Sequence, residues 1–373
     1  LDDLINAKSI MESLFSKKWY RKLINNKQEV MIGYSDSSKD AGKICASWHQ
    51  YKAQEEIVRL GKKFDVNVTF FHGRGGSPGR GGGPIQATLR SQPPGSVNGK
   101  IRITDQGEVI QQKYGYQPIA EYNLCSYIGA VTEATLNPPP TPKQNWRSLI
   151  EKMSDISKSS YRKNINQSSE FIKYFKTVTP SAALGKLSIG SRPSKRKNVD
   201  NIKSLRAIPW VFAWTQIRLM LPAWLGSAEA LRYAYIKKFR RTLIDMEKNW
   251  PFFNSMLDIL DMVITKADPD ISKIYEKYLA DDALKKIGKK LRFQFEVIKK
   301  LNKKITTKEV ILTRKQFRTL ITVRAIYSEV LNIIQPIVIY KLKKNKIMSD
   351  KKYLNDALLT SIAGISAAMK NTG

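Results

Sequence analysis

The sequence predicts an α/β protein in which parallel strand–helix units are followed by a largely helical region. In residues 1–130, short apolar runs alternate with polar loops and amphipathic segments, the order found in parallel βα units. Beyond Leu149, apolar residues recur mainly at helical spacing. The chain has 373 residues, 42% of them hydrophobic, which allows one large domain or two ordinary ones with a sizeable core.

The predicted elements of the first part follow one another closely. A helix opens at Asp2 and places five apolar side chains on one face: Leu4, Ala7, Met11, Leu14 and Phe15. The next elements, in order, are a strand Val30–Tyr34, a loop Ser35–Asp40, a helix from about Ala46 to Leu60, and strands Val66–Phe71 and Ile101–Thr104. Because parallel βα units carry their chemistry at the carboxyl ends of strands, we expect functional residues in the loops that follow.

The second part is predicted to be helical, with long helices such as Leu243–Met262 and Lys308–Leu342. Two loops stand out, the proline-rich Asn137–Pro142, which we expect to be a stiff connector, and the basic Gly190–Lys197. The apolar stretch from Ala207 to Leu231 is interrupted by prolines, Gln216 and Arg218, which argues against a membrane span.

The formal net charge of +32 leaves two interpretations open. A strongly basic chain can bind nucleic acid or an anionic membrane surface. The lysines are, however, scattered over predicted helix surfaces, as in 299–304 and 341–346, with no recognisable nucleic-acid-binding module among them. We favour the interpretation that they are solvated surface residues.

The two cysteines, Cys45 and Cys125, form neither a disulfide framework nor a metal-ligand cluster. This usage indicates a reducing compartment, and we expect both to be small buried residues.

The run from His72 to Pro84 is the most informative segment. Glycine loses the most backbone freedom on folding, so a glycine-rich run is retained where backbone N–H groups must approach a ligand closely. Arg74, Arg80 and His72 lie in the same run and predict a site for a phosphorylated or carboxylated small molecule. The alternative is a disordered Gly/Arg tract that binds nucleic acid. The run lacks the Gly-Lys-Ser/Thr ending and the glycine spacing of the known phosphate and dinucleotide loops.

Motifs along the chain occur together in one known family. In order they are VMIGYSDSSKDAG at 30–42, YKAQEE at 51–56, the glycine run, SQPP at 91–94, ITDQGE at 103–108, LRAIPWVFAWTQ at 205–216, LPAWLG at 221–226, WPFF at 250–253 and NTG at 371–373. By these motifs the chain closely resembles the C-terminal portion of phosphoenolpyruvate carboxylase, and the resemblance covers nearly its whole length.

The resemblance implies a TIM-like α/β barrel with extensive additional helices, mostly α by residue count and incomplete in this chain. The chain would form one portion of a single catalytic domain. Residues 1–130 would supply βα units with catalytic loops, and residues 131–373 a mainly helical part with the 190–206 loop and effector-site residues. The implied activity is that of a cytoplasmic lyase, which irreversibly carboxylates phosphoenolpyruvate with bicarbonate to give oxaloacetate and phosphate, replenishing the tricarboxylic acid cycle.

The resemblance also implies residue roles. Asp36 would bind Mg²⁺ or Mn²⁺, and three residues would take part in catalysis: Lys39, His72 and Arg80. Three arginines would bind substrate: Arg74, Arg192 and Arg206. Taken alone, each of these residues also has a purely structural explanation. An aspartate after a strand, such as Asp36, is commonly an N-cap, and a Ser-Ser-Lys-Asp turn, such as the one with Lys39, is commonly solvated. An arginine such as Arg192 or Arg206 commonly forms a surface salt bridge. His49 matches no family motif, and we expect it to be an ordinary helix residue.

A second implied site would take a dicarboxylate effector, aspartate or malate. Its residues would be Lys266, Arg324 and Asn371, with Arg80 shared with catalysis, so that an effector holding Arg80 removes a charge that the transition state needs. The family is usually a homotetramer.

The sequence also departs from the family. The catalytic histidine, a further phosphate-binding arginine and the second metal-binding carboxylate would lie in an N-terminal half that this sequence lacks, so we expect no activity from the chain alone. Pro78 stiffens the glycine run, and 198–203 replaces a usual Gly-Gly. The alternatives are therefore a degenerate remnant or a basic fragment that binds nucleic acid.

Overall fold

The computed structural model describes residues 1–73, 85–105, 107–166, 169–184, 206–236, 238–306, 312–344 and 347–369. Within them, the first part contains α1 (Asp2–Ile5), α2 (Ala7–Phe15), α3 (Lys18–Leu23), β1 (Lys27–Gly33), α4 (Ser35–Ala41), α5 (Lys43–Phe64), β2 (Asn67–Gly73), α6 (Ile85–Arg90), β3 (Arg102–Ile103), α7 (Gly107–Tyr114) and α8 (Gln117–Leu136). The second part contains α9 (Gln144–Asn166), α10 (Ser169–Val178), α11 (Ala207–Gln216), the short 3₁₀ helix η3 (Leu221–Ala223), α12 (Ser227–Tyr235), α13 (Arg240–Asn249), α14 (Pro251–Lys266), α15 (Pro269–Leu279), α16 (Asp282–Ile305), α17 (Leu312–Lys344) and α18 (Met348–Met369).

The three strands form one parallel sheet in the order β1-β2-β3. Val30 and Ile32 pair with Phe70 and His72 in the register of β1 and β2, so these four side chains share one face. That face packs with α2 and α5 in a small core that includes Met11, Phe15, Ile57 and Leu60. The three predicted strands are thus confirmed, with shifted ends and a third strand of only two residues.

Helix α5 lies between the sheet and the rest of the protein. Ile57 and Leu60 near its C-terminal end belong to the sheet core, whereas Trp48 and Tyr51 belong to a much larger core built by α9 to α18. Because it is covered on several sides, buried residues occur all along α5, from Lys43 to Gly61. The large core is rich in aromatic rings, such as the edge-on pair Trp210 and Trp214, whose centroids are 5.5 Å apart.

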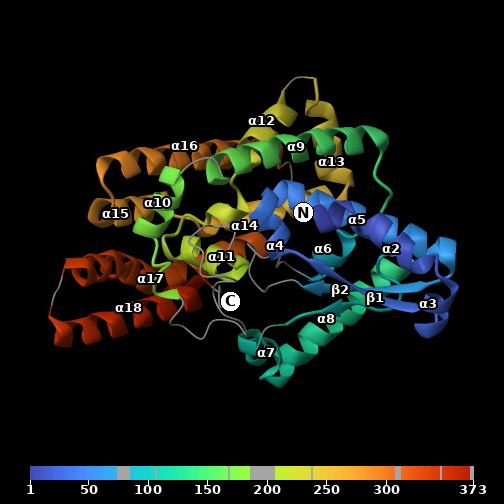
Figure 1. Cartoon of the computed structure of the whole chain (residues 1–373), viewed down its shortest axis with the longest axis horizontal. Helices are drawn as coiled ribbons and strands as arrows, with labels where there is room; N and C mark the ends of the chain where they lie inside the picture. The colour runs from blue at the N-terminus through green and yellow to red at the C-terminus, as the bar shows by residue number, and fades with distance from the viewer. Residues whose placement is uncertain are drawn as a thin grey trace.

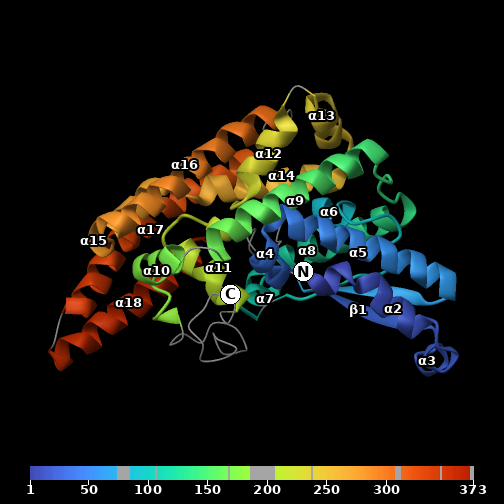
Figure 2. The ribbon, with the colours of Figure 1, turned by 45° about the horizontal axis from the view of Figure 1, so that its top comes forward.

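The sheet and the long C-terminal helices lie at opposite ends of the molecule (Figures 1 and 2). In both views β1 lies toward one end with α2 and α3, and the packed pair α17 and α18 lies toward the other. Helix α11 lies between them, close to α4.

Several expectations need correction. The segment 35–40 is not a loop but part of helix α4, because Ser37 and Ser38 bond back to carbonyls at the end of β1 and close a helical turn. The predicted helix Leu243–Met262 is two helices, since Pro251 cannot donate its nitrogen to a continuing helix and α14 starts anew there. Cys45 is buried as expected, but Cys125 is exposed on α8.

Other expectations are confirmed. The proline-rich segment after Leu136 connects α8 to α9, and the lysines within 299–304 are exposed on α16. No helix in the described part of the chain is long and apolar enough to cross a membrane. The predominance of helix and the parallel strand order agree with the predicted class, while closure into a TIM-like barrel stays a prediction.

Candidate active site

The carboxyl ends of β1 and β2 lie side by side at one edge of the sheet. In their parallel register Ile32 is opposite His72, and Gly33 is opposite Gly73. Helix α4 follows β1 directly, and the glycine-rich run follows β2. Ligands of parallel α/β folds bind at this edge, because the segments after neighbouring strands converge there.

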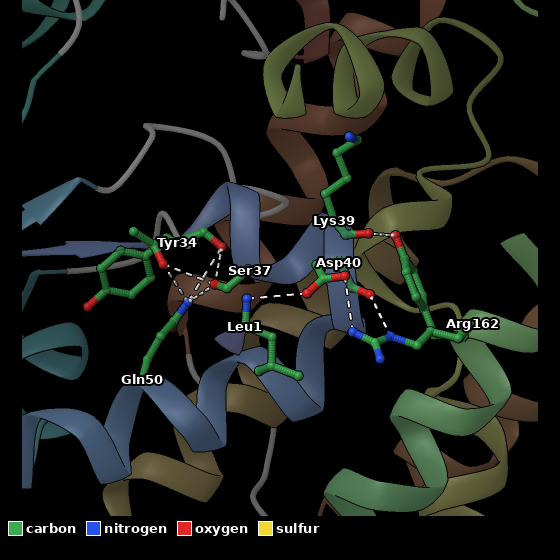
Figure 3. A network of polar contacts seen from close by, with 9 residues as sticks. Leu1, Tyr34, Ser37, Lys39, Asp40, Gln50 and Arg162 are labelled. Atoms are coloured by element: carbon green, nitrogen blue, oxygen red, sulfur yellow. Dashed lines mark hydrogen bonds and ion pairs between the residues drawn. The ribbon is translucent and has the colours of Figure 1, made fainter. Parts of the chain in front are cut away.

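Helix α4 is held at its start by hydrogen bonds to the end of β1. The Ser37 hydroxyl donates to the Gly33 carbonyl at 3.0 Å, and the Ser38 hydroxyl donates to the Tyr34 carbonyl at 2.9 Å. Gln50 on α5 adds a third tie, because its amide donates to Ser37 Oγ at 2.8 Å and to the Gly33 carbonyl at 3.2 Å. Figure 3 shows Tyr34, Ser37 and Gln50 meeting at the strand end.

The other end of α4 is held by α9. Tyr161 donates its hydroxyl proton to the Lys39 carbonyl at 2.7 Å, and Arg162 bonds both the carbonyl and the carboxylate of Asp40. Gly42, at φ +80°, lets the chain turn into α5 where any Cβ would lie 3.2 Å from the Tyr161 ring. The backbone of α4 is therefore fixed at both ends, while the Asp36 side chain is exposed and the Lys39 side chain is half-buried and directed away from Arg162 (Figure 3).

His72 is buried beside this helix, with 1% of its surface exposed. Its Nδ1 lies 2.7 Å from the Tyr34 hydroxyl. A neutral imidazole can accept the phenolic proton at Nδ1, whereas an imidazolium would have to donate there, so this contact and the protonation of the ring depend on each other.

Arg206 lies at the start of α11, which packs against α4. Its Nε is buried and makes no hydrogen bond within the described structure. A guanidinium N–H that is buried without an acceptor is costly, and a phosphate or carboxylate oxygen would satisfy it with a charge-assisted hydrogen bond. The described structure thus brings Asp36, Lys39, His72 and Arg206 to one region, whereas three other predicted residues, Arg74, Arg80 and Arg192, lie outside the described residues.

The comparisons with known proteins agree on one family. A family model described as phosphoenolpyruvate carboxylase matches residues 1–373. The chain belongs to the phosphoenolpyruvate carboxylase family.

The curated relatives carry the same name over the whole of this chain. Proteins named phosphoenolpyruvate carboxylase from Marinomonas sp. (strain MWYL1) and Shewanella sediminis are each 46% identical to it over 374 aligned residues, and one from Proteus mirabilis is 45% identical. Each alignment covers 100% of this chain but only 42% of the relative, so the chain spans less than half the length of these carboxylases.

One of the implied effector residues, Lys266, lies at the end of α14. Lys266 is buried, and its ammonium donates to the Met369 carbonyl at 2.9 Å, close to the predicted Asn371, which lies outside the described residues. Arg324 lies on α17, one turn before Ser328. The structure therefore brings Lys266 near the end of α18, and Arg218 connects it to α17.

Arg218 is a residue whose role the sequence interpretation missed. Its Nε donates to the Lys266 carbonyl at 3.0 Å and its Nη1 to Ser328 Oγ at 3.4 Å. Burial lowers the pKa of this guanidinium, although Asp268 and Glu329 act in the opposite direction. The signal for it in the sequence is its position as the lone arginine in the apolar stretch from Ala207 to Leu231.

A divalent metal would find one protein ligand here. No group of three or more His, Cys, Asp or Glu side chains suited to a metal occurs among the described residues. Asp36 contributes a single exposed carboxylate at the strand edge, and Mg²⁺ is commonly held by one or two carboxylates together with water and substrate oxygens. The residues present therefore fit part of a Mg²⁺ or Mn²⁺ site.

Proposed function

We propose that this chain supplies the strand-end portion of a phosphoenolpyruvate carboxylase. This carboxy-lyase converts phosphoenolpyruvate and bicarbonate irreversibly to oxaloacetate and phosphate. The oxaloacetate replenishes the tricarboxylic acid cycle. The observation that carries the proposal is Arg206, whose buried Nε has no acceptor among the described residues and which begins a helix packed on α4. Family membership and the identity to named carboxylases support it.

In the proposed reaction a bicarbonate oxygen attacks phosphorus, and the bond from phosphorus to the enol oxygen breaks. This gives carboxyphosphate and the enolate of pyruvate. Carboxyphosphate then releases carbon dioxide and phosphate, and the enolate carbon bonds to carbon dioxide. Every species except carbon dioxide is an anion, so the site must supply positive charge where water is excluded.

The roles proposed for the described residues follow from their chemistry. Arg206 would bind the phosphate with its forked N–H donors, together with Arg74. Arg192 would be a further substrate-binding arginine. Lys39, on a backbone fixed from both ends, would stabilise the bicarbonate or the developing enolate. His72 would stay neutral and donate a hydrogen bond to substrate from Nε2 while Nδ1 accepts from Tyr34. Arg80 would complete the set.

Asp36 would hold Mg²⁺ or Mn²⁺. When bound, such an ion supplies Lewis-acid stabilisation of substrate oxygens. The second carboxylate ligand would come from the part of the carboxylase that precedes the aligned region of the relatives.

Regulation and surroundings complete the proposal. A dicarboxylate such as aspartate or malate would bind near Lys266, Arg324 and Asn371 and withdraw Arg80 from catalysis, and the assembled enzyme would be a homotetramer. The free thiols Cys45 and Cys125 suit a reducing cytoplasm.

The test joins this chain to the preceding portion of the Marinomonas relative and measures oxaloacetate formation with Mg²⁺ and bicarbonate. We expect Arg206→Ala to weaken phosphoenolpyruvate binding by about 2–5 kcal/mol, because it leaves a buried anion unpaired. Arg241→Ala, an exposed arginine on α13, is the matched control and should leave binding unchanged. Full activity in the Arg206→Ala enzyme would refute the proposal.

The alternatives from the sequence are not favoured by the comparisons, because a match over the entire chain at this identity concerns a carboxylase. The basic alternative has its own test. If this chain binds duplex DNA by neutralising phosphates, the logarithm of its binding constant must fall linearly with the logarithm of the salt concentration. A steep slope would revive that alternative, and a flat one would remove it.

A further inference from the structure

A hollow lies between α5 and α14 where α6 ends. It opens to solvent, and the volume of about 430 Å³ includes part of that open space. Lys43, Ser47, Gln50 and Gln54 recur on one face of α5 and line its polar side. From α14, Phe252, Met256 and Ile259 line the opposite, apolar side.

The polar side carries a positive charge. Lys43 is only 7% exposed, and none of the described residues that line the hollow is an aspartate or glutamate. Lys43 is also the first residue of the 22-residue helix α5, so its ammonium adds to the positive end of the helix dipole. The hollow therefore favours a ligand with one negative charge.

The hollow also holds an acceptor that needs a donor. Gln54 is 1% exposed, and while its amide donates to the Gln50 carbonyl at 3.1 Å, its Oε1 has no hydrogen-bond partner within the described structure. A buried amide oxygen without a donor is costly, and a ligand hydroxyl would satisfy it. Ser255 on α14 is a second buried hydroxyl-bearing side chain on the wall.

From this combination we propose that the hollow is a binding site for a short hydroxycarboxylate, distinct from the phosphoenolpyruvate site. The carboxylate bonds Lys43, the hydroxyl donates to Gln54 Oε1, and the hydrocarbon part contacts Phe252 and Met256. One cation suits a monoanion better than a phosphate dianion.

One side chain contacts both the hollow and the strand edge. Tyr34 lines the hollow, and its hydroxyl contacts His72 Nδ1 at 2.7 Å (Figure 3 shows Tyr34 beside Gln50). A ligand that contacts Tyr34 in the hollow would therefore change the environment of the His72 ring, and His72 is one of only two histidines in the chain.

The experiment measures binding of lactate and of propionate, which lacks the hydroxyl, to the 373-residue chain by saturation-transfer NMR. We expect lactate to bind about fivefold to tenfold more tightly, the value of one hydrogen bond to a buried acceptor. Gln54→Leu should abolish this difference, and Lys43→Gln should weaken both ligands. Ser255→Ala, on the opposite wall, should weaken lactate binding by a smaller factor than Gln54→Leu does.

The matched control is Gln294→Leu on α16. Gln294 Oε1 is also a buried amide oxygen without a partner in the described structure, but it does not line the hollow, so this variant should bind as the parent does. Thermal unfolding checks that each variant is folded. Equal affinity for lactate and propionate, retention of the difference in folded Gln54→Leu, or no binding of either ligand, which would mean that only water fills the hollow, would each overturn the proposal. None of these readouts needs carboxylase activity.

Discussion

At the scale of single residues, the candidate site combines a fixed backbone with side chains that point away from the groups fixing it. Lys39 shows this, because its carbonyl is held by Tyr161 while its side chain leaves α4 in another direction. Arg206 shows the other requirement, a buried donor without an acceptor in the described structure. Such frustrated groups are retained where a ligand satisfies them.

His49, to which the family resemblance gives no catalytic role, should make the stability of the fold depend on pH. Burial, with help from Lys52 and against the effect of Glu151, lowers the pKa of His49 from 6.5 to about 4. Between these values the unfolded chain binds the proton and the folded chain does not, so the stability contribution is present above pH 6.5 and is lost as the pH falls toward 4. We expect a loss of roughly 2 kcal/mol after solvent screening.

The measurement is urea unfolding of the parent and of His49→Gln between pH 6.5 and pH 4. Gln stays neutral, so the variant should lose less stability over this interval. Parallel pH profiles for the two proteins would contradict the assignment.

At the scale of elements, the packing of α15 against α16 depends on a glycine. Glu276 on α15 is 3% exposed, accepts from the Tyr174 hydroxyl at 2.8 Å and pairs with Arg292. Gly288 on α16 faces this carboxylate so closely that an added Cβ would collide with its oxygens. The two helices can approach at this point only because the side chain is absent.

We therefore expect Gly288→Ala to displace Glu276 and to destabilise the fold by about 3 kcal/mol, since a buried charge would lose its partners. The control is Gly129→Ala on α8, where an added Cβ meets nothing within 4 Å and should raise helix stability slightly. Urea unfolding measures both. If the two variants have equal stability, the close packing is not what requires glycine.

At the scale of the whole molecule, this chain exposes apolar surface that most folded proteins cover. On α17, Leu320, Val323, Ile326 and Val330 are each at least half exposed. The chain also spans only 42% of the length of its relatives. Exposed apolar patches of this kind are covered by other protein surface in stable assemblies.

We expect the chain alone to bind the dye ANS strongly and to bind less of it after coexpression with the preceding portion of the Marinomonas relative. Leu320→Lys with Val323→Lys should lower dye binding by the chain alone. Weak binding at the outset would show that the α17 face is already covered.

The sequence by itself determined the family and the parallel strands, because these depend on local motifs and on apolar periodicity. The sequence led to a wrong prediction where one local pattern is compatible with two backbone structures. The Ser-Ser-Lys-Asp segment can form a loop or a helix, and only its contacts with β1, Gln50 and α9 make it a helix.

Tertiary structure alone decided which polar groups remain buried without a partner. Nothing local distinguishes Arg206 or Gln54 from a surface residue of the same type. Their burial is set by α4 and α14, which are distant from them in sequence. Burial is a property of packing between elements, and the sequence pattern of one element does not contain it.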